Sequence, residues 1–209
     1  MRRSTRWPAI ALLLGGCYSF STLGRARTVE AEHFEVFGAP EALIVATDSG
    51  ASIRPVGDLG VRYGATRELE LDARVTTLGL SAGARVQLYR SPDPHTGVDL
   101  LVAPGLAYTA QDKLAIEAPL LFGINLGEHQ IVIAPRLVYQ MRLGVPATPG
   151  PVSFLYAGGS IGVAIQLDSH VALMPEIALL GQIYSDPGFT SNVANALGIQ
   201  GAIGLLVDP

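Results

Sequence analysis

Apolar and polar side chains alternate along most of this chain, most regularly over residues 114–142. A period of two indicates β-strands, because successive side chains of a strand point to opposite faces. The polar break at 127–129 divides this stretch into the two strands of a hairpin. The strand charges, Glu117, Arg136 and Arg142, all fall in one phase, and the other phase carries none. This pattern favours a hairpin whose uncharged face is turned to lipid.

The same alternation continues in other parts of the chain and predicts an all-β fold. With residues 29–47 counted as one strand, ten strands are expected, over residues 29–47, 58–63, 69–75, 80–89, 98–108, 114–125, 131–142, 155–166, 171–182 and 197–207. An even number is typical of bacterial single-chain barrels, and eight or twelve strands would also fit the pattern. We therefore predict an antiparallel up-and-down β-barrel of about ten strands.

The composition is that of a membrane protein without membrane helices. Only 15% of the residues are charged, against roughly one quarter in soluble domains. After the first twenty positions, no apolar stretch reaches the roughly 18 residues that a transmembrane helix needs. A closed barrel is the other structure that satisfies its backbone hydrogen bonds in lipid. The net charge is -4, and the sequence has no basic cluster of the kind that binds nucleic acid. Membrane lipid is therefore the expected partner, and nucleic acid is not.

The first residues are expected to form a targeting segment. Three arginines among the first six residues precede a short apolar core, and residues 14–17 read Leu-Gly-Gly-Cys. This box resembles the lipobox of bacterial lipoproteins, which implies cleavage before Cys17 and lipidation of its sulfur. An ordinary signal peptide with an incidental thiol is the alternative. The expected organisation is a signal peptide over 1–16, a lipidated and flexible tether over 17–27, and a barrel domain over 28–209.

Other motifs carry a resemblance that covers most of the mature chain. Residues 62–64 read RYG, residues 69–74 read LELDAR, and residues 24–38 read GRARTVEAEHFEVFG. These motifs resemble proteobacterial outer-membrane barrel proteins of unassigned function. The resemblance implies the outer membrane of a diderm bacterium as the location and brings no catalytic residues with it. The lack of Asp after Cys17 implies the same membrane by resemblance to lipoprotein sorting signals.

The lengths of the breaks between strands predict the topology. Three long connections are expected at one end of the barrel, at 48–55, 143–152 and 185–193, and short turns at the other, near 64–67, 127–128 and 168–169. The short turns and the N-terminus are expected on the periplasmic side. Four strands carry a central proline, at Pro104, Pro119, Pro135 and Pro175. Because strand prolines normally lie at edges or bulges, we expect a ring of bulges or an open seam.

Inward-facing charges are the candidate functional residues. The predicted polar network in the lumen consists of Arg62, Glu70, Asp72, Arg74, Arg85, Asp99, Glu117, Arg136 and Glu176. Buried charges persist when they are paired and hydrogen-bonded, and acids and bases are close to balanced here. Structural ion-pair packing is the favoured interpretation, because side chains can fill so small a barrel. A polar pore or a catalytic carboxylate pair is the alternative.

Few other residues carry chemistry. Tyr63, Tyr108 and Tyr139 lie in the apolar phase at strand ends, as in the aromatic girdles of membrane barrels, although ordinary packing of tyrosine would look the same. The four histidines do not form a cluster with ligand spacing, so no metal or cofactor is expected. Ser169-His170 is the only adjacent pair that a lipid hydrolase could use.

These observations predict a lipid-anchored outer-membrane barrel that is not an enzyme and that serves as an envelope structural protein or a narrow pore. The first alternative is a lipid-anchored periplasmic barrel, similar to lipocalins, that binds an apolar ligand. In that protein the apolar phase would face inward. The second alternative is an outer-membrane lipid-modifying hydrolase.

Overall fold

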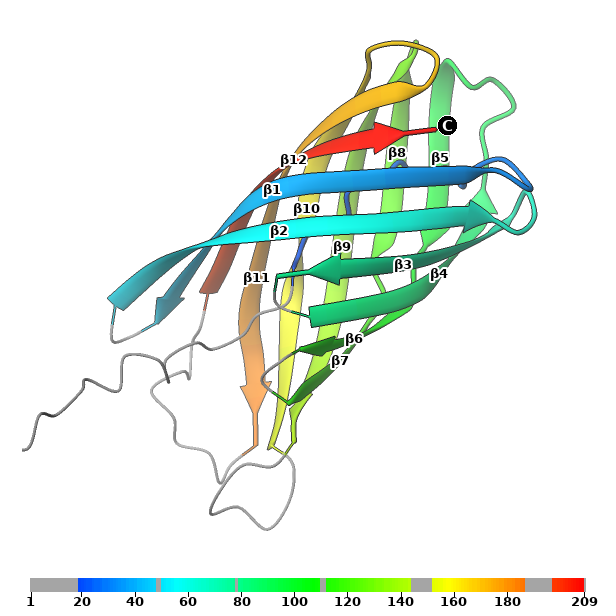
Figure 1. Ribbon diagram of the computed structural model, residues 1–209. Coiled ribbons are helices and arrows are strands. Elements are labelled where there is room, and N and C mark those ends of the chain that lie inside the picture. Colours follow the sequence, from blue (N-terminus) through cyan, green and yellow to red (C-terminus); the bar gives the residue numbers. More distant parts are fainter. Residues whose placement is uncertain are drawn as a thin grey trace, which may run out of the picture.

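The computed structural model describes residues 19–47, 50–77, 79–109, 112–143, 152–186 and 197–208. These residues form a closed antiparallel barrel in which β1 pairs with β12 (Figure 1). Within the described ranges, twelve strand segments make ten barrel strands, because β5 and β6 are successive halves of one strand and β7 and β8 of the next. The predicted ten-stranded antiparallel barrel is confirmed. No helix in these ranges is long and apolar enough to cross a membrane.

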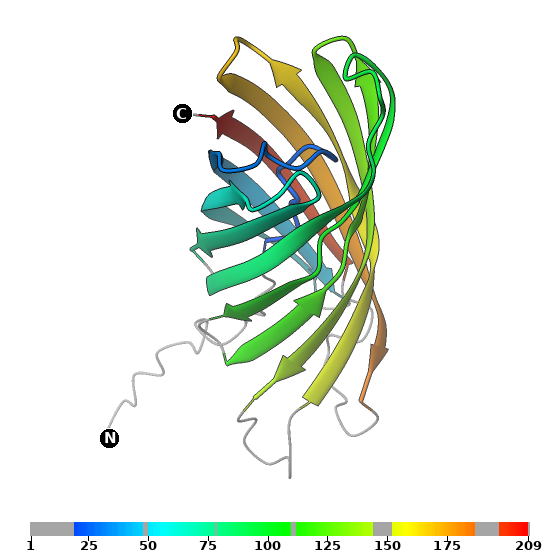
Figure 2. The same ribbon diagram turned by 90° about the vertical axis from the view of Figure 1, so that its right-hand side faces the viewer.

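The strands follow one another around the barrel in chain order. Their bounds are β1 Phe34–Thr47, β2 Gly50–Gly64, β3 Leu69–Thr76, β4 Gly79–Tyr89, β5 Thr96–Val102, β6 Gly105–Thr109, β7 Lys113–Glu117, β8 Leu120–Leu126, β9 His129–Arg142, β10 Val152–Gln166, β11 Val171–Ser185 and β12 Leu197–Val207. All of these strands are inclined to the barrel axis (Figure 2).

Side chains alternate between the lumen and the outer surface as the sequence predicted. Large apolar residues face outward on every part of the wall, with Ile53 73%, Leu59 61% and Ile177 61% exposed. Charged residues of the other phase are buried inside, as Arg62 and Glu70 illustrate. A continuous apolar outer surface with a polar interior suits a lipid environment, because lipid cannot solvate charge.

The central prolines do not open the barrel. Pro104 divides β5 from β6 and Pro119 divides β7 from β8, and the backbone bonds around them are retained, since Ala103 N donates to Pro119 O at 2.9 Å. Pro135 and Pro175 lie inside uninterrupted strands, β9 and β11. The expectation of an open seam was wrong, because two prolines in neighbouring strands break at matching positions and leave the cross-strand ladder intact on either side.

The expected short turns gather at one end of the barrel. The turns at 65–68, 90–95, 127–128 and 167–170 share one end, here called the short-turn end, with the start of β1 and the end of β12. The opposite end, here called the long-connection end, carries the last residues of β1, β9 and β11, and most of the expected long connections at 143–152 and 185–193 lies outside the described residues. The expected long connection at 48–55 is wrong, because β1 and β2 remain paired to Thr47↔Gly50. The predicted first strand also begins late, at Phe34, after a turn.

Residues 19–29, here called the lumenal segment, lie inside the barrel (Figure 2). Ser19 bonds to Glu41 and Gln200 in the middle of the wall, and Val29 bonds to Glu70 near the short-turn end. The chain therefore runs through the lumen toward the short-turn end before it enters β1. A flexible tether on the periplasmic side was expected for residues 17–27, and their described part is instead buried, because wall side chains satisfy its backbone.

Candidate functional site

The candidate site is the lumen itself, where wall side chains bind the backbone of the lumenal segment. Six main-chain amides donate to side-chain oxygens of the barrel at 2.7–2.9 Å: Phe20 to Gln200, Thr22 and Leu23 to Glu176, Ala26 to Gln130, Thr28 to Gln87, and Val29 to Glu70. A buried amide without a partner would cost roughly 1–3 kcal/mol. These bonds therefore replace the strand ladder that the segment lacks.

Arginines of the wall satisfy the carbonyls of the same segment. Arg74 donates to the carbonyls of Ser21 at 2.9 Å and Thr22 at 3.1 Å, and Arg62 donates to those of Thr22 at 3.3 Å and Leu23. Guanidinium groups suit this task, because each presents several donors in a fixed planar fork. Further donors reach the carbonyls nearer the short-turn end, from Arg85 to residue 25 and from Gln87 to residue 26.

Glycines shape the wall to the side chains of the segment. A Cβ placed on Gly198 would lie 2.5 Å from the Phe20 ring, one on Gly204 would lie 2.8 Å from Leu23, and one on Gly123 would lie 2.8 Å from Ala26. These distances are shorter than van der Waals contact, so larger residues would exclude the segment. Gly24 has the complementary role, because its own Cβ would lie 2.8 Å from the Arg62 guanidinium.

All nine residues of the predicted polar network lie on lumen-facing strand positions, and most of them meet. Arg62 and Arg85 share Glu70, at 3.5 and 2.7 Å. Arg136 pairs with Glu117 at 3.3 Å. The remaining members meet residues outside the predicted set: Arg74 pairs with Asp58 at 3.2 Å, Asp99 with Arg27 at 3.0 Å, and Glu176 binds the lumenal segment. Asp72 lines a small cavity with Ser21 and Thr22.

The sequence did not predict that this polar network binds residues 19–29 inside the lumen. Glu41 is 6% exposed and accepts from Ser19 at 3.1 Å, from Ser21, and from Gln200 at 2.6 Å. The lumenal segment shows no period in its sequence, because neighbours surround it on all sides. Its small side chains, Ser, Thr, Gly and Ala, are the signal that would have suggested a segment enclosed in a narrow space.

Two small cavities lie inside the described lumen, beside residues 19–22 of the lumenal segment. Their volumes are about 40 and about 10 Å³, and they share Arg74, Ser81 and Glu117. Arg136 lines the cavity of about 40 Å³, and its buried Nε and Nη2 atoms have no hydrogen-bond partner in the protein. A cavity of this size and polarity suits a few water molecules, since each needs roughly 10–15 Å³ and two to four polar partners.

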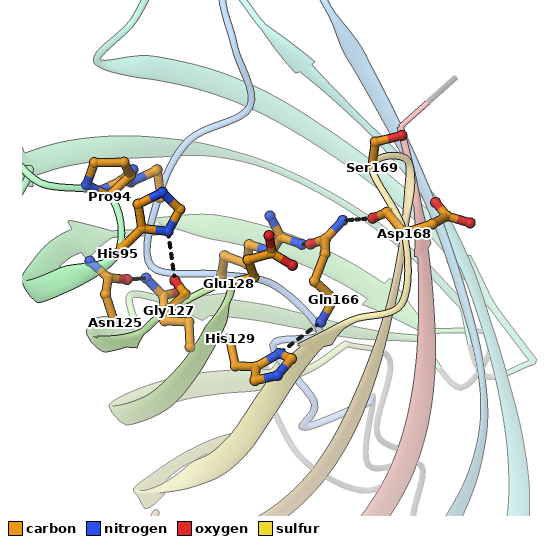
Figure 3. Close-up of a pocket in the computed structure, with 12 residues that line it drawn as sticks. Pro94, His95, Asn125, Gly127, Glu128, His129, Gln166, Asp168 and Ser169 are labelled. Atoms are coloured by element: carbon orange, nitrogen blue, oxygen red, sulfur yellow. Dashed lines mark hydrogen bonds between the residues drawn. The ribbon is translucent and has the colours of Figure 1, made fainter.

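A larger cavity of about 450 Å³ opens at the short-turn end, between the turns 94–95, 127–129 and 168–169 (Figure 3). Its histidines are fixed by backbone: His95 Nδ1 donates to Gly127 O at 3.3 Å, and His129 Nδ1 accepts from Gln166 N at 3.2 Å. Ser169 also lines it, but within the described ranges no hydrogen bond joins its hydroxyl to a histidine. The described residues likewise contain no cluster of three potential metal ligands. The arrangement supplies polar side chains and backbone carbonyls around an open cavity.

The predicted tyrosines lie at both ends of the outer surface. Tyr63 is half-buried near the short-turn end, with its ring 4.7 Å from that of Phe34. Tyr108 and Tyr139 are 46% and 40% exposed near the long-connection end, where their hydroxyls donate to Asp112 and Ser153 at 2.9 Å. The predicted lipidation site, Cys17, lies outside the described residues.

Comparison with known proteins gives information on the fold. The chain matches no family model and no curated protein sequence. Among solved structures, it is similar to the outer membrane protease OmpT from Escherichia coli, with 6% identity, a TM-score of 0.50, and coverage of 88% of this chain and 100% of that chain. The Neisserial surface protein A shows 11% identity, a TM-score of 0.45, and coverage of 84% and 97%. The translocator domain of the autotransporter NalP from Neisseria meningitidis shows 8% identity and a TM-score of 0.46, with coverage of 85% of this chain and 89% of that chain. At these identities the similarity concerns the barrel fold alone.

Proposed function

We propose that this protein is a lipid-anchored barrel of the bacterial outer membrane with a structural role in the envelope, that it lacks enzymatic activity, and that its own N-terminal segment closes its lumen. The observation that carries the proposal is the lumenal segment, which wall side chains bind along residues 19–29. A passage for solutes needs a continuous open path. The cavities beside residues 19–22 amount to only about 40 and about 10 Å³, whereas the cavity of about 450 Å³ beside Arg25 and Arg27 opens at the short-turn end.

The lipid anchor of this proposal is a diacylglyceryl group on the sulfur of Cys17, as the lipobox-like sequence suggests.

A narrow pore is the second candidate, supported by the polar cavities around Arg74 and Arg136. The lipocalin-like alternative fits the molecule less well, because its apolar phase would have to face inward. The apolar phase here faces outward, as the exposure of Ile177 and Leu179 shows.

Two measurements on the mature protein test the proposal. In planar bilayers with KCl on both sides, the wild-type protein should leave the conductance at the level of the lipid alone. Steady single-channel steps would favour the narrow pore instead. In cells given an alkyne-tagged fatty acid, the wild-type protein should become labelled and Cys17→Ser should not. Equal labelling of both proteins, or of neither, would refute the lipid anchor.

A further inference from the structure

The wall of the lumen carries a small excess of negative charge once the lumenal segment is disregarded, with eight acidic and seven basic side chains on its described strands. In the described ranges, eight acidic side chains occupy inward-facing positions between the two rims: Glu35, Glu41, Asp58, Glu70, Asp72, Asp99, Glu117 and Glu176. Four guanidinium groups face them, from Arg62, Arg74, Arg85 and Arg136. Three further cations also lie on the wall: Arg54 at the level of Leu43 and Gln200, and Lys113 and Arg142 near the long-connection rim.

The lumenal segment supplies the positive groups that this wall lacks. Arg27 pairs with the fully buried Asp99 at 3.0 Å, and Arg25 reaches Gln166 near the same end. Amide groups of the segment donate to Glu176 at 2.7 and 2.8 Å and to Glu70 at 2.8 Å. The wall and the segment are thus complementary in charge, and removal of the segment would leave several carboxylates facing open space.

The segment is also separable from the barrel. Each of the ten barrel strands pairs with its two neighbours without help from residues 19–29, which belong to no strand. Its bonds to the wall are made by side chains, and water can replace these partners. Leu23 has a φ of +40°, a left-handed conformation that is unfavourable for leucine and that withdrawal would relieve.

From these observations we propose that residues 19–29 are a removable plug and that the barrel without the docked plug is a pore selective for small cations. An extended chain fills the lumen now, so its withdrawal leaves a path wide enough for water and simple ions. A channel lined by one sign of charge with low-dielectric walls raises the local counter-ion concentration by about tenfold or more. The proposal goes beyond the structural role above and rests on it in one respect, that the native barrel is closed.

The test displaces the plug without changing the wall. Gly24→Leu places a side chain where even a Cβ would lie 2.8 Å from the Arg62 guanidinium, and Arg62 is held by Glu35 and Glu70. Gly201→Leu is the matched control, because Gly201 faces outward with nothing within 4 Å of its Cβ position. A second variant, Leu23→Glu, displaces the plug by burying a carboxylate in the apolar cluster that Leu23 shares with Met174 and Leu206. Heat-modifiable gel mobility reports whether each barrel is folded.

Conductance and reversal potential are measured in planar bilayers with a KCl gradient. We expect no conductance above that of the lipid for the wild type and for Gly201→Leu. Gly24→Leu or Leu23→Glu should conduct, with a reversal potential shifted toward the equilibrium potential of potassium. Adding Glu176→Gln to Gly24→Leu should lower the potassium preference. Silence of both plug variants in folded form would overturn the proposal and leave the closed structural barrel standing. Anion preference would overturn the charge argument, whereas conductance of the wild type would instead refute the closed barrel.

Discussion

Glu176 offers the most direct test of how strongly the lumenal segment is bound. Its carboxylate is 3% exposed and accepts three hydrogen bonds from the segment, from Thr22 N at 2.7 Å, Leu23 N at 2.8 Å and Thr22 Oγ1 at 3.0 Å. Hydrogen bonds to a charged group contribute about 1.5–3 kcal/mol each, but they are not additive, and removal of the carboxylate also removes its desolvation cost. For Glu176→Ala we therefore expect the docked segment to lose about 3 kcal/mol.

The rate at which trypsin cleaves the lumenal segment measures this loss of binding free energy. Arg25 and Arg27 are the cleavage sites in the segment, and both lie within the lumen while the segment is docked. When release and rebinding are fast, cleavage follows the population of the released state. About 3 kcal/mol corresponds to roughly a 150-fold faster cleavage, since every 1.4 kcal/mol is tenfold. Glu176→Gln retains one acceptor oxygen and should fall between the wild type and Glu176→Ala.

A control variant should change an exposed acid that does not contact the lumenal segment. Asp112→Asn changes an exposed acid at the β6–β7 turn, at the opposite end of the barrel from Arg25 and Arg27, and should leave the cleavage rate unchanged. Gel mobility before heating shows that each barrel is intact. Wild-type cleavage rates in a folded Glu176→Ala barrel would refute the conclusion that this carboxylate holds the segment.

Three further predictions concern the wall and a turn. Ile177→Arg places a cation at the centre of the outer surface of β11 and should lower the free energy of unfolding in liposomes by about 2–4 kcal/mol, whereas Ile177→Ala should not show this charge penalty in urea titrations. Gly60→Ala brings a Cβ within 2.2 Å of the Phe37 ring, which is stacked at 4.1 Å on the Arg62 guanidinium, and should cost about 1–3 kcal/mol, with the open Gly201→Ala as the unaffected control. The Thr96 hydroxyl, and then the His95 amide, lower the pKa of Asp93 in the β4–β5 turn. This turn should therefore be ordered above the ordinary aspartate pKa and loosen as the pH falls through the lowered pKa. Amide exchange of His95 and Thr96 should follow that titration in the wild type, and a titration that persists in Asp93→Asn would refute the assignment.

Local alternation in the sequence was enough to determine ten strands and their faces, although the start of β1 and the first part of β2 were misplaced. A strand that separates lipid from a lumen must change polarity at every residue, so this information lies in adjacent positions. Glu70, Asp99 and Arg136 could be placed in the lumen for that reason. Pro104 and Pro119 were recognised as exceptions, but their effect depended on each other, because they interrupt neighbouring strands at matching positions.

The tertiary structure alone decided what the lumen contains. The partners of Thr22 and Leu23 lie about 150 positions away at Glu176, and that of Phe20 lies 180 positions away at Gln200. A segment that is enclosed on all sides, by polar groups and by apolar clusters, has no separate polar and apolar faces, so it leaves no period in the sequence. Its backbone, rather than its side chains, makes most of the contacts that hold it, and the backbone is the same for every sequence. Closure of the barrel creates the enclosed site, and residues 19–29 have a defined place only once that site exists.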